Sequence, residues 1–151
     1  MLNYKRQIED SVSLIFKSGI TEVVMKERYK VLVVDDHPIN IKVAQQFLNR
    51  LGYSDITIAE NGKNALKFIN DDFSLILLDI ELPDINGFDV CKYIRASLMQ
   101  QIPIIAVTAN MLDDKFIEKC NLVGIDDVIN KPYKIDLLEL KINEWLEKYK
   151  L

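Results

Sequence analysis

The chain has 151 residues, is 49% hydrophobic and 28% charged, and contains only five Gly and four Pro. This composition predicts one folded domain with a sizeable core and argues against a largely disordered chain. The net charge of −4, with no basic tract, argues against nucleic acid or an anionic membrane as the main partner.

The cysteines and the hydropathy pattern bear on the compartment. Cys91 and Cys120 occupy apolar helical positions without CxxC spacing, which predicts two buried free thiols. The sequence has no secretory signal, and no apolar run approaches the roughly 20 residues of a membrane helix. We therefore expect a cytoplasmic location without direct membrane contact, for a whole protein or for a piece of a longer one.

Residues 1–28 differ in pattern from the rest of the chain. Ile8, Val12 and Ile15 recur there at helical spacing among charged residues. This pattern predicts either an amphipathic helical segment that docks on the domain, or a linker that orders only against a neighbour. The folded domain is expected to span residues 29–151.

Five short apolar runs predict buried strands, and they alternate with amphipathic helical patterns. The strands are expected at residues 30–34, 56–59, 74–79, 102–107 and 127–130. The helices are expected at residues 38–51, 62–69, 87–98, 113–123 and 135–146. Such alternation predicts an α/β fold, a doubly wound parallel sheet with right-handed crossovers and helices on both faces.

Polar residues follow four of the five predicted strands. They are Asp35 and Asp36 after the first strand, Asp79 after the third, Thr108 after the fourth and Lys131 after the fifth. The carboxyl ends of parallel strands meet at one edge of the sheet, which is where ligands bind in open α/β folds. We therefore expect these five side chains to form one site.

The residue types at this edge suit phosphoryl transfer. Carboxylate oxygens are ligands for a hard cation such as Mg²⁺ or Mn²⁺, and a carboxylate can itself become an acyl phosphate. An ammonium and a hydroxyl group can neutralise and bind phosphoryl oxygens. A plain salt bridge between Lys131 and Asp79 is the alternative, but it leaves Thr108 and the Asp35–Asp36 pair without a role.

Four short motifs resemble, in chain order, those of response-regulator receiver domains. They are Val33-Val34-Asp35-Asp36, Leu78-Asp79 with Pro83 and Gly87, Val107-Thr108-Ala109, and Lys131-Pro132. The resemblance covers about residues 29–149. It implies a flavodoxin-like (βα)5 fold with strand order 2-1-3-4-5.

The resemblance also implies a role for each polar residue. It makes Asp79 the phosphorylated residue, and it makes Lys131 and Thr108 the phosphoryl contacts. The metal ligands that it implies are Asp36, Asp79 and the main-chain carbonyl of Glu81 directly, and Asp35 through water. It further implies a cis peptide bond before Pro132.

Longer stretches are similar to the receivers of hybrid sensor histidine kinases, which exchange phosphoryl groups with histidine phosphotransfer domains. These stretches are residues 35–40, 59–62, 108–110 and 124–127. The single histidine, His37, is expected in a loop, so we expect neither a kinase core nor a phosphotransfer domain in this chain. Only five residues follow Leu146, which leaves no room for a DNA-binding output domain.

The resemblance thus implies a signalling receiver rather than an ordinary enzyme. Such a receiver catalyses its own phosphorylation and slow dephosphorylation, takes its phosphoryl group from a histidine kinase or a phosphotransfer domain, and can form a weak homodimer. The parent chain could be a histidine kinase. One departure concerns Val128, where the family commonly has Tyr or Phe, so the usual aromatic rotamer switch does not carry over to this chain.

Two alternatives remain open. A phosphotransferase resembling haloacid dehalogenases also uses an Asp nucleophile, but it needs a second Asp two positions on, where Glu81 stands. A non-phosphorylated interaction module of the same fold would leave the full set of polar residues without a role.

The docking surface for the phosphoryl donor is expected at the start of the first helix, next to Asp36. Ile39 and Ile41 are surplus to the predicted inward stripe of that helix, which consists of Val43, Ala44, Phe47, Leu48 and Leu51, so the pattern predicts them as exposed docking residues. The alternative is that one of them packs under a neighbouring loop.

Overall fold

The computed structural model describes residue 26 and residues 28–149, and within them strands and helices alternate. The strands are β1 (Lys30–Val34), β2 (Asp55–Ala59), β3 (Leu75–Asp79), β4 (Ile104–Thr108) and β5 (Asp127–Asn130). The helices are α2 (Pro38–Arg50), α3 (Gly62–Phe68), α4 (Gly87–Ser97), α5 (Asp114–Val123) and α6 (Ile135–Lys148). The five strands and five helices predicted between residues 30 and 146 are all present, and only their ends differ. The predicted N-terminal segment lies almost wholly outside the described residues, so the boundary at residue 29 stays a prediction.

The five strands form one parallel sheet in the order β2-β1-β3-β4-β5, which confirms the predicted fold. The central strands β3 and β4 are buried at every residue, whereas β2 and β5, at the sheet edges, are only partly buried. After β2 the chain crosses to the other side of β1 before it forms β3. The sheet order therefore reverses between β1 and β3, and the ends of these two strands flank the point where such folds bind ligands.

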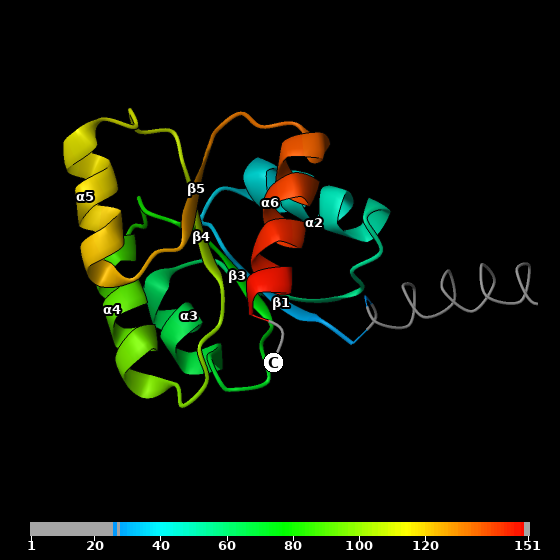
Figure 1. Ribbon diagram of the computed structural model, residues 1–151, viewed down its shortest axis with the longest axis horizontal. Helices are drawn as coiled ribbons and strands as arrows, with labels where there is room; N and C mark the ends of the chain where they lie inside the picture. Colours follow the sequence, from blue (N-terminus) through cyan, green and yellow to red (C-terminus); the bar gives the residue numbers. More distant parts are fainter. Residues whose placement is uncertain (1–25, 27, 150–151) are drawn as a thin grey trace, which may run out of the picture.

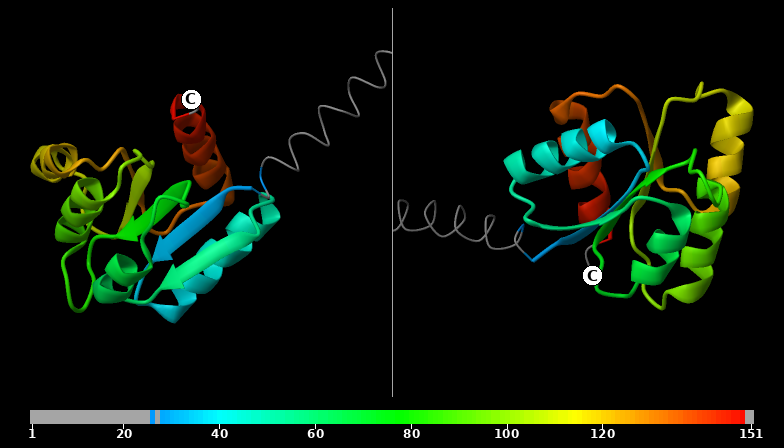
Figure 2. Two further views of the ribbon diagram at one scale, coloured as in Figure 1. Left: turned by 90° about the horizontal axis from the view of Figure 1, so that it is seen from below. Right: turned by 180° about the vertical axis from the view of Figure 1, so that it is seen from behind.

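Helices cover both faces of the sheet (Figures 1 and 2). Helices α2 and α6 pack on one face, and α3, α4 and α5 pack on the other. Alternate residues of each central strand serve opposite faces, as the twofold period of a strand requires. Val31, Val33, Leu75 and Leu77 face α2 and α6, while Leu32, Val34, Ile76 and Leu78 face the other three helices.

The prediction that Ile41 is exposed is wrong. Ile41 is 9% exposed, whereas Ile39 is 67% exposed. Ile41 precedes Ala44 by three residues and Leu48 by seven, so all three lie on the buried face of α2. Ile41 thus belongs to the inward stripe, and Ile39 is the only one of the two predicted docking residues that reaches the surface.

Both cysteines are free and buried, as predicted. Cys91 lies on α4, where its thiol donates to the Val123 carbonyl oxygen at 3.4 Å, and Cys120 lies on α5. Burial raises the pKa of Cys91 to about 11 and also raises the pKa of Cys120. Both groups are therefore neutral thiols at physiological pH.

Within residues 28–149 no helix has the length and apolar character to cross a membrane.

Candidate functional site

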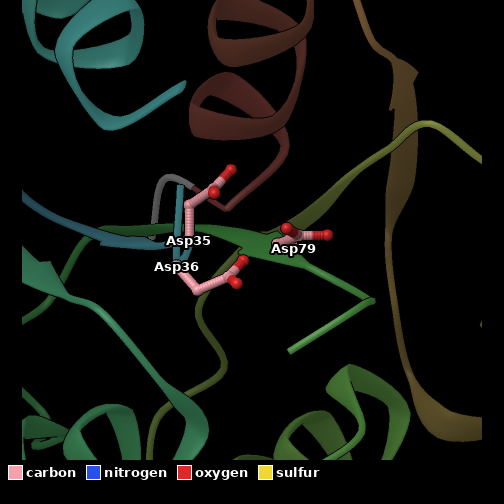
Figure 3. Close-up of side chains that lie close together, drawn as sticks. All are labelled: Asp35, Asp36 and Asp79. Atoms are coloured by element: carbon pink, nitrogen blue, oxygen red, sulfur yellow. The ribbon is translucent and has the colours of Figure 1, made fainter. Parts of the chain in front are cut away.

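Three carboxylates meet at the carboxyl edge of the sheet (Figure 3). Asp35 and Asp36 follow β1, and Asp79 ends β3. Each of them offers an oxygen atom within 4.8 Å of the others. Asp35 and Asp79 are buried, at 5% and 6% exposed, while Asp36 is exposed. The structure therefore brings the predicted acidic residues together, with one carboxylate open to solvent.

Lys131 is the cation of this cluster. Its Nζ atom donates to Asp35 Oδ2 at 2.7 Å and to Asp79 Oδ2 at 3.1 Å. The backbone N–H of Lys131 donates to the Thr108 carbonyl oxygen at 2.8 Å, which fixes the end of β5 beside β4. The Lys131–Pro132 peptide bond is cis, in agreement with the predicted geometry at Pro132. The ammonium group therefore lies between two of the three acids.

The ionisation of the site follows from burial and from this ion pair. Burial raises the pKa of Asp79 above its ordinary value, although the charge of Lys131 and the N–H of Glu81 act in the opposite direction. Burial alone would lower the pKa of Lys131, but the hydrogen bond and charge of Asp35, together with Asp79, raise it. Lys131 is consequently a cation at neutral pH, held by the acids that it neutralises.

The charges and donor atoms of the cluster fit a divalent cation. Three carboxylates and one ammonium group leave a formal charge of −2, which one Mg²⁺ or Mn²⁺ ion would neutralise. Carboxylate oxygens are the donors that such hard ions prefer. Asp36 has no ion-pair partner among the described residues and is open to solvent, so a metal ion can reach the cluster from that side.

Thr108 lies at the end of β4 and is fully buried. Its hydroxyl oxygen accepts a hydrogen bond from the N–H of Asn110 at 3.1 Å. The Asn130 side chain, from the end of β5, donates to the carbonyl oxygens of Thr108 at 2.9 Å and of Asn110 at 2.8 Å. Asn130 thus holds the β4–α5 connection against the end of β5 through two hydrogen bonds. The sequence pattern did not single it out, because the two partners lie 20 and 22 residues away.

The loop after β3 completes the site. The N–H of Glu81 donates to Asp79 Oδ1 at 3.0 Å, and the N–H of Gly87 donates back to the Ile80 carbonyl oxygen at 2.8 Å. A Cβ atom at Gly87 would lie 2.5 Å from the Asp79 carbonyl oxygen, so only glycine allows this close return. The loop therefore leaves β3 after Asp79 and returns at Gly87, where its backbone contacts Asp79 and Ile80 again.

A pocket of about 520 Å³ adjoins the acidic cluster, between α2 and the connection from β5 to α6. Its lining includes Ile39 and Val43 of α2, Tyr133 of the connection, and both Asp35 and Lys131. The Tyr133 ring packs edge-on against Phe47 of α2, with 5.8 Å between ring centroids. An apolar surface therefore continues from the start of α2 to the buried acids.

Solved structures with this fold include a receiver domain with a bound magnesium ion. The receiver domain of a sensor histidine kinase from Pseudomonas aeruginosa, described with a magnesium ion coordinated in its active-site cleft, aligns with a TM-score of 0.70 at 32% identity. That alignment covers 79% of this chain and 98% of the other. A CheY-like receiver domain protein from Methanospirillum hungatei aligns with a TM-score of 0.72 at 28% identity, over 80% and 95% of the two chains.

Curated relatives include a hybrid signal transduction protein and a sensor protein. The hybrid signal transduction protein dokA of Dictyostelium discoideum is 40% identical over 134 residues, which are 86% of this chain and 8% of the relative. The aerobic respiration control sensor protein ArcB of Escherichia coli is 36% identical over 118 residues, which are 76% of this chain and 15% of the relative. The chain thus spans only a small part of these relatives. The response regulator receiver domain family matches residues 31–143, and the chain belongs to this family of two-component signalling domains.

Proposed function

We propose that Asp79 of this receiver accepts a phosphoryl group from a phosphohistidine, with Mg²⁺ or Mn²⁺ held by the acidic cluster, and that the modified domain then changes its signalling surface. The observation that carries the proposal is the placement of Asp79. The residue is 6% exposed, and its carboxylate lies 3.1 Å from the Lys131 ammonium group and adjoins two further acids. Such sites work mainly by positioning and by charge neutralisation.

The transfer itself needs few groups. An oxygen of the Asp79 carboxylate attacks phosphorus, the phosphorus–nitrogen bond of the donor breaks, and its electron pair stays on the imidazole, which takes up a proton. Asp36, Asp79 and the Glu81 main-chain carbonyl would hold a divalent ion directly, and Asp35 would hold it through water. Such an ion would supply positive charge to the phosphoryl oxygens. Lys131 would move from its pairing with Asp79 onto a phosphoryl oxygen, and the Thr108 hydroxyl would donate to another.

One experiment distinguishes this proposal from its alternatives. The protein is incubated with acetyl phosphate and Mg²⁺, and its intact mass is followed over time. Stable addition of one phosphoryl group supports the receiver function. Rapid multiple turnover without a lasting adduct would support a phosphotransferase like the haloacid dehalogenases, and no reaction would leave an interaction module of the same fold.

We further propose that the natural donor is a histidine phosphotransfer domain or a histidine kinase, and that the parent chain is a hybrid kinase. The likeness to the hybrid signal transduction protein dokA and to the sensor protein ArcB supports this proposal. The receiver would contribute its own slow dephosphorylation, and a cytoplasmic location and a weak homodimer fit the same role. With Val128 in place of the common aromatic residue, the usual aromatic rotamer change is not part of the proposal.

The donor is proposed to dock on Ile39. Ile39 is 67% exposed and lies on the first turn of α2. It lines the same pocket as Asp35 and Lys131. We expect Ile39→Asp to slow phosphoryl transfer from a phosphorylated phosphotransfer domain by about tenfold or more, because a charge in a docking core is costly. Labelling by acetyl phosphate should stay near the wild-type rate, since the small donor needs no docking surface.

The matched control is Met99→Asp. Met99 is 94% exposed and follows α4, at the amino edge of the sheet, so this variant adds the same charge away from the site. Met99→Asp should leave both reactions unchanged. Equal slowing of the two reactions in Ile39→Asp would mean that Ile39 supports the acidic site itself, and the docking role would be abandoned.

A further inference from the structure

Asp84 lies in the loop after β3, and its carboxylate accepts hydrogen bonds from a distant element. The N–H groups of Gly62 and Lys63, at the start of α3, donate to Asp84 Oδ1 and Oδ2, both at 2.8 Å. The N–H of Ile85 also donates to Oδ1, at 2.9 Å. An exposed side chain thus joins two segments that are distant in the chain, since Asp84 follows Gly62 by 22 residues and Lys63 by 21 residues.

The contact between these segments is close. A Cβ atom at Gly62 would lie 2.9 Å from Ile85 Cβ and 3.2 Å from Asp84 Oδ1, so a larger residue at Gly62 would force the loop away. Desolvation acts to raise the pKa of Asp84, but the N–H groups of Lys63, Gly62 and Ile85, together with its own, lower it below its ordinary value. Asp84 is therefore a carboxylate at neutral pH, the form that these donors favour.

The two joined segments carry different parts of the acidic site. Helix α3 follows β2, and the Ala59 carbonyl oxygen at the end of β2 accepts from the N–H of Asp35 at 3.1 Å. The loop of Asp84 begins at Asp79, whose carboxylate accepts from the N–H of Glu81. Asp84 is therefore a hydrogen-bonded link, outside the sheet, between the segment that positions Asp35 and the segment that carries Asp79 and Glu81.

We infer that Asp84 is a positioning residue of the metal site, which holds the Glu81 loop against α3 so that the oxygens of the two segments stay at the spacing a divalent ion requires. This inference rests on the proposed function of the acidic cluster. Residues that orient metal ligands are important for affinity, because a loosely held ligand must be ordered when the ion binds. Asp84 itself offers its oxygens to backbone N–H groups and not to the ion.

The test is a titration of the wild type and of Asp84→Ala with MgCl₂, followed through the amide NMR shifts of residues 79–87. We expect roughly tenfold weaker Mg²⁺ binding in Asp84→Ala, at the lower end of the effects known for residues that orient metal ligands. Phosphorylation by acetyl phosphate should need correspondingly more Mg²⁺ for half of its maximal rate, while the rate at saturating Mg²⁺ stays near that of the wild type. The Mg²⁺ affinity of Asp84→Asn should lie between those of the wild type and Asp84→Ala, because its single amide oxygen can still accept from the N–H of Gly62.

Asp71→Ala is a matched control. Asp71 is also exposed and accepts two backbone N–H groups, those of Met99 at 3.0 Å and Gln100 at 3.2 Å, but it lies at the opposite edge of the sheet. Its loss should leave Mg²⁺ binding unchanged. Equal Mg²⁺ affinity of Asp84→Ala and the wild type, or equal weakening by Asp71→Ala, would overturn the inference. Absence of Mg²⁺ binding in the wild type would overturn the proposed function itself.

Discussion

Asp79→Asn should abolish labelling by acetyl phosphate. The amide cannot act as the nucleophile, because its nitrogen lone pair is delocalised and its oxygen carries no full negative charge. The substitution is nearly isosteric, so the amide oxygen can still accept from the N–H of Glu81, which now contacts Asp79 at 3.0 Å. Intact mass after incubation with acetyl phosphate and Mg²⁺ should show one added phosphoryl group on the wild type and none on the variant.

Asp72→Asn provides the comparison. Asp72 is exposed and precedes β3, at the amino edge of the sheet, so this variant makes the same chemical change away from the acidic cluster. It should be labelled like the wild type. A phosphoryl group that still adds to Asp79→Asn would place the acceptor elsewhere, and Asp79 would lose its proposed role.

Asp36→Ala should abolish the Mg²⁺-dependent NMR shifts of the amides around Asp79. Asp35 and Asp79 already share the Lys131 ammonium group, whereas Asp36 is the exposed acid of the cluster. Its removal changes the formal charge of the cluster from −2 to −1 and deletes a ligand oxygen, so a divalent ion would lose both attraction and coordination. Phosphorylation by acetyl phosphate should then no longer depend on Mg²⁺.

Glu60→Ala is the control for charge. Glu60 follows β2 at the same edge of the sheet and is exposed, but it is not part of the three-carboxylate cluster. We expect a Mg²⁺ titration close to that of the wild type. If Asp36→Ala titrates with Mg²⁺ as the wild type does, Asp36 is not a ligand and the metal must be held by other oxygens.

Much of the fold could be predicted because its signals are local. The alternation of buried strands and amphipathic helices needs only the periodicity of about ten residues at a time. The turn residues also act locally: Pro38 begins α2, and Gly124, in the left-handed conformation at φ 92°, ends α5. The strand order 2-1-3-4-5 came from the family resemblance and not from these patterns, because periodicity does not specify which strands pair.

The candidate site was predictable for a related reason. Parallel strands end at one edge, so Asp35, Asp79, Thr108 and Lys131 had to converge there once the strands were assigned. The detailed contacts were not predictable. The burial of Ile41, by contrast, follows from local spacing, since it precedes Ala44 by three residues and Leu48 by seven and so shares their face of α2.

The sequence by itself determined the elements, their alternation and the residue types gathered at one edge of the sheet. Only the tertiary structure decided that Lys131 bridges Asp35 and Asp79, and that Asn130 binds the β4–α5 connection. It also decided that Asp84 accepts from the N–H groups of Gly62 and Lys63 at the start of α3. The physical reason is the distance along the chain over which each kind of interaction acts. Periodicity and turn chemistry act within one element, whereas these hydrogen bonds join segments whose separation is fixed only when helices and sheet have packed together.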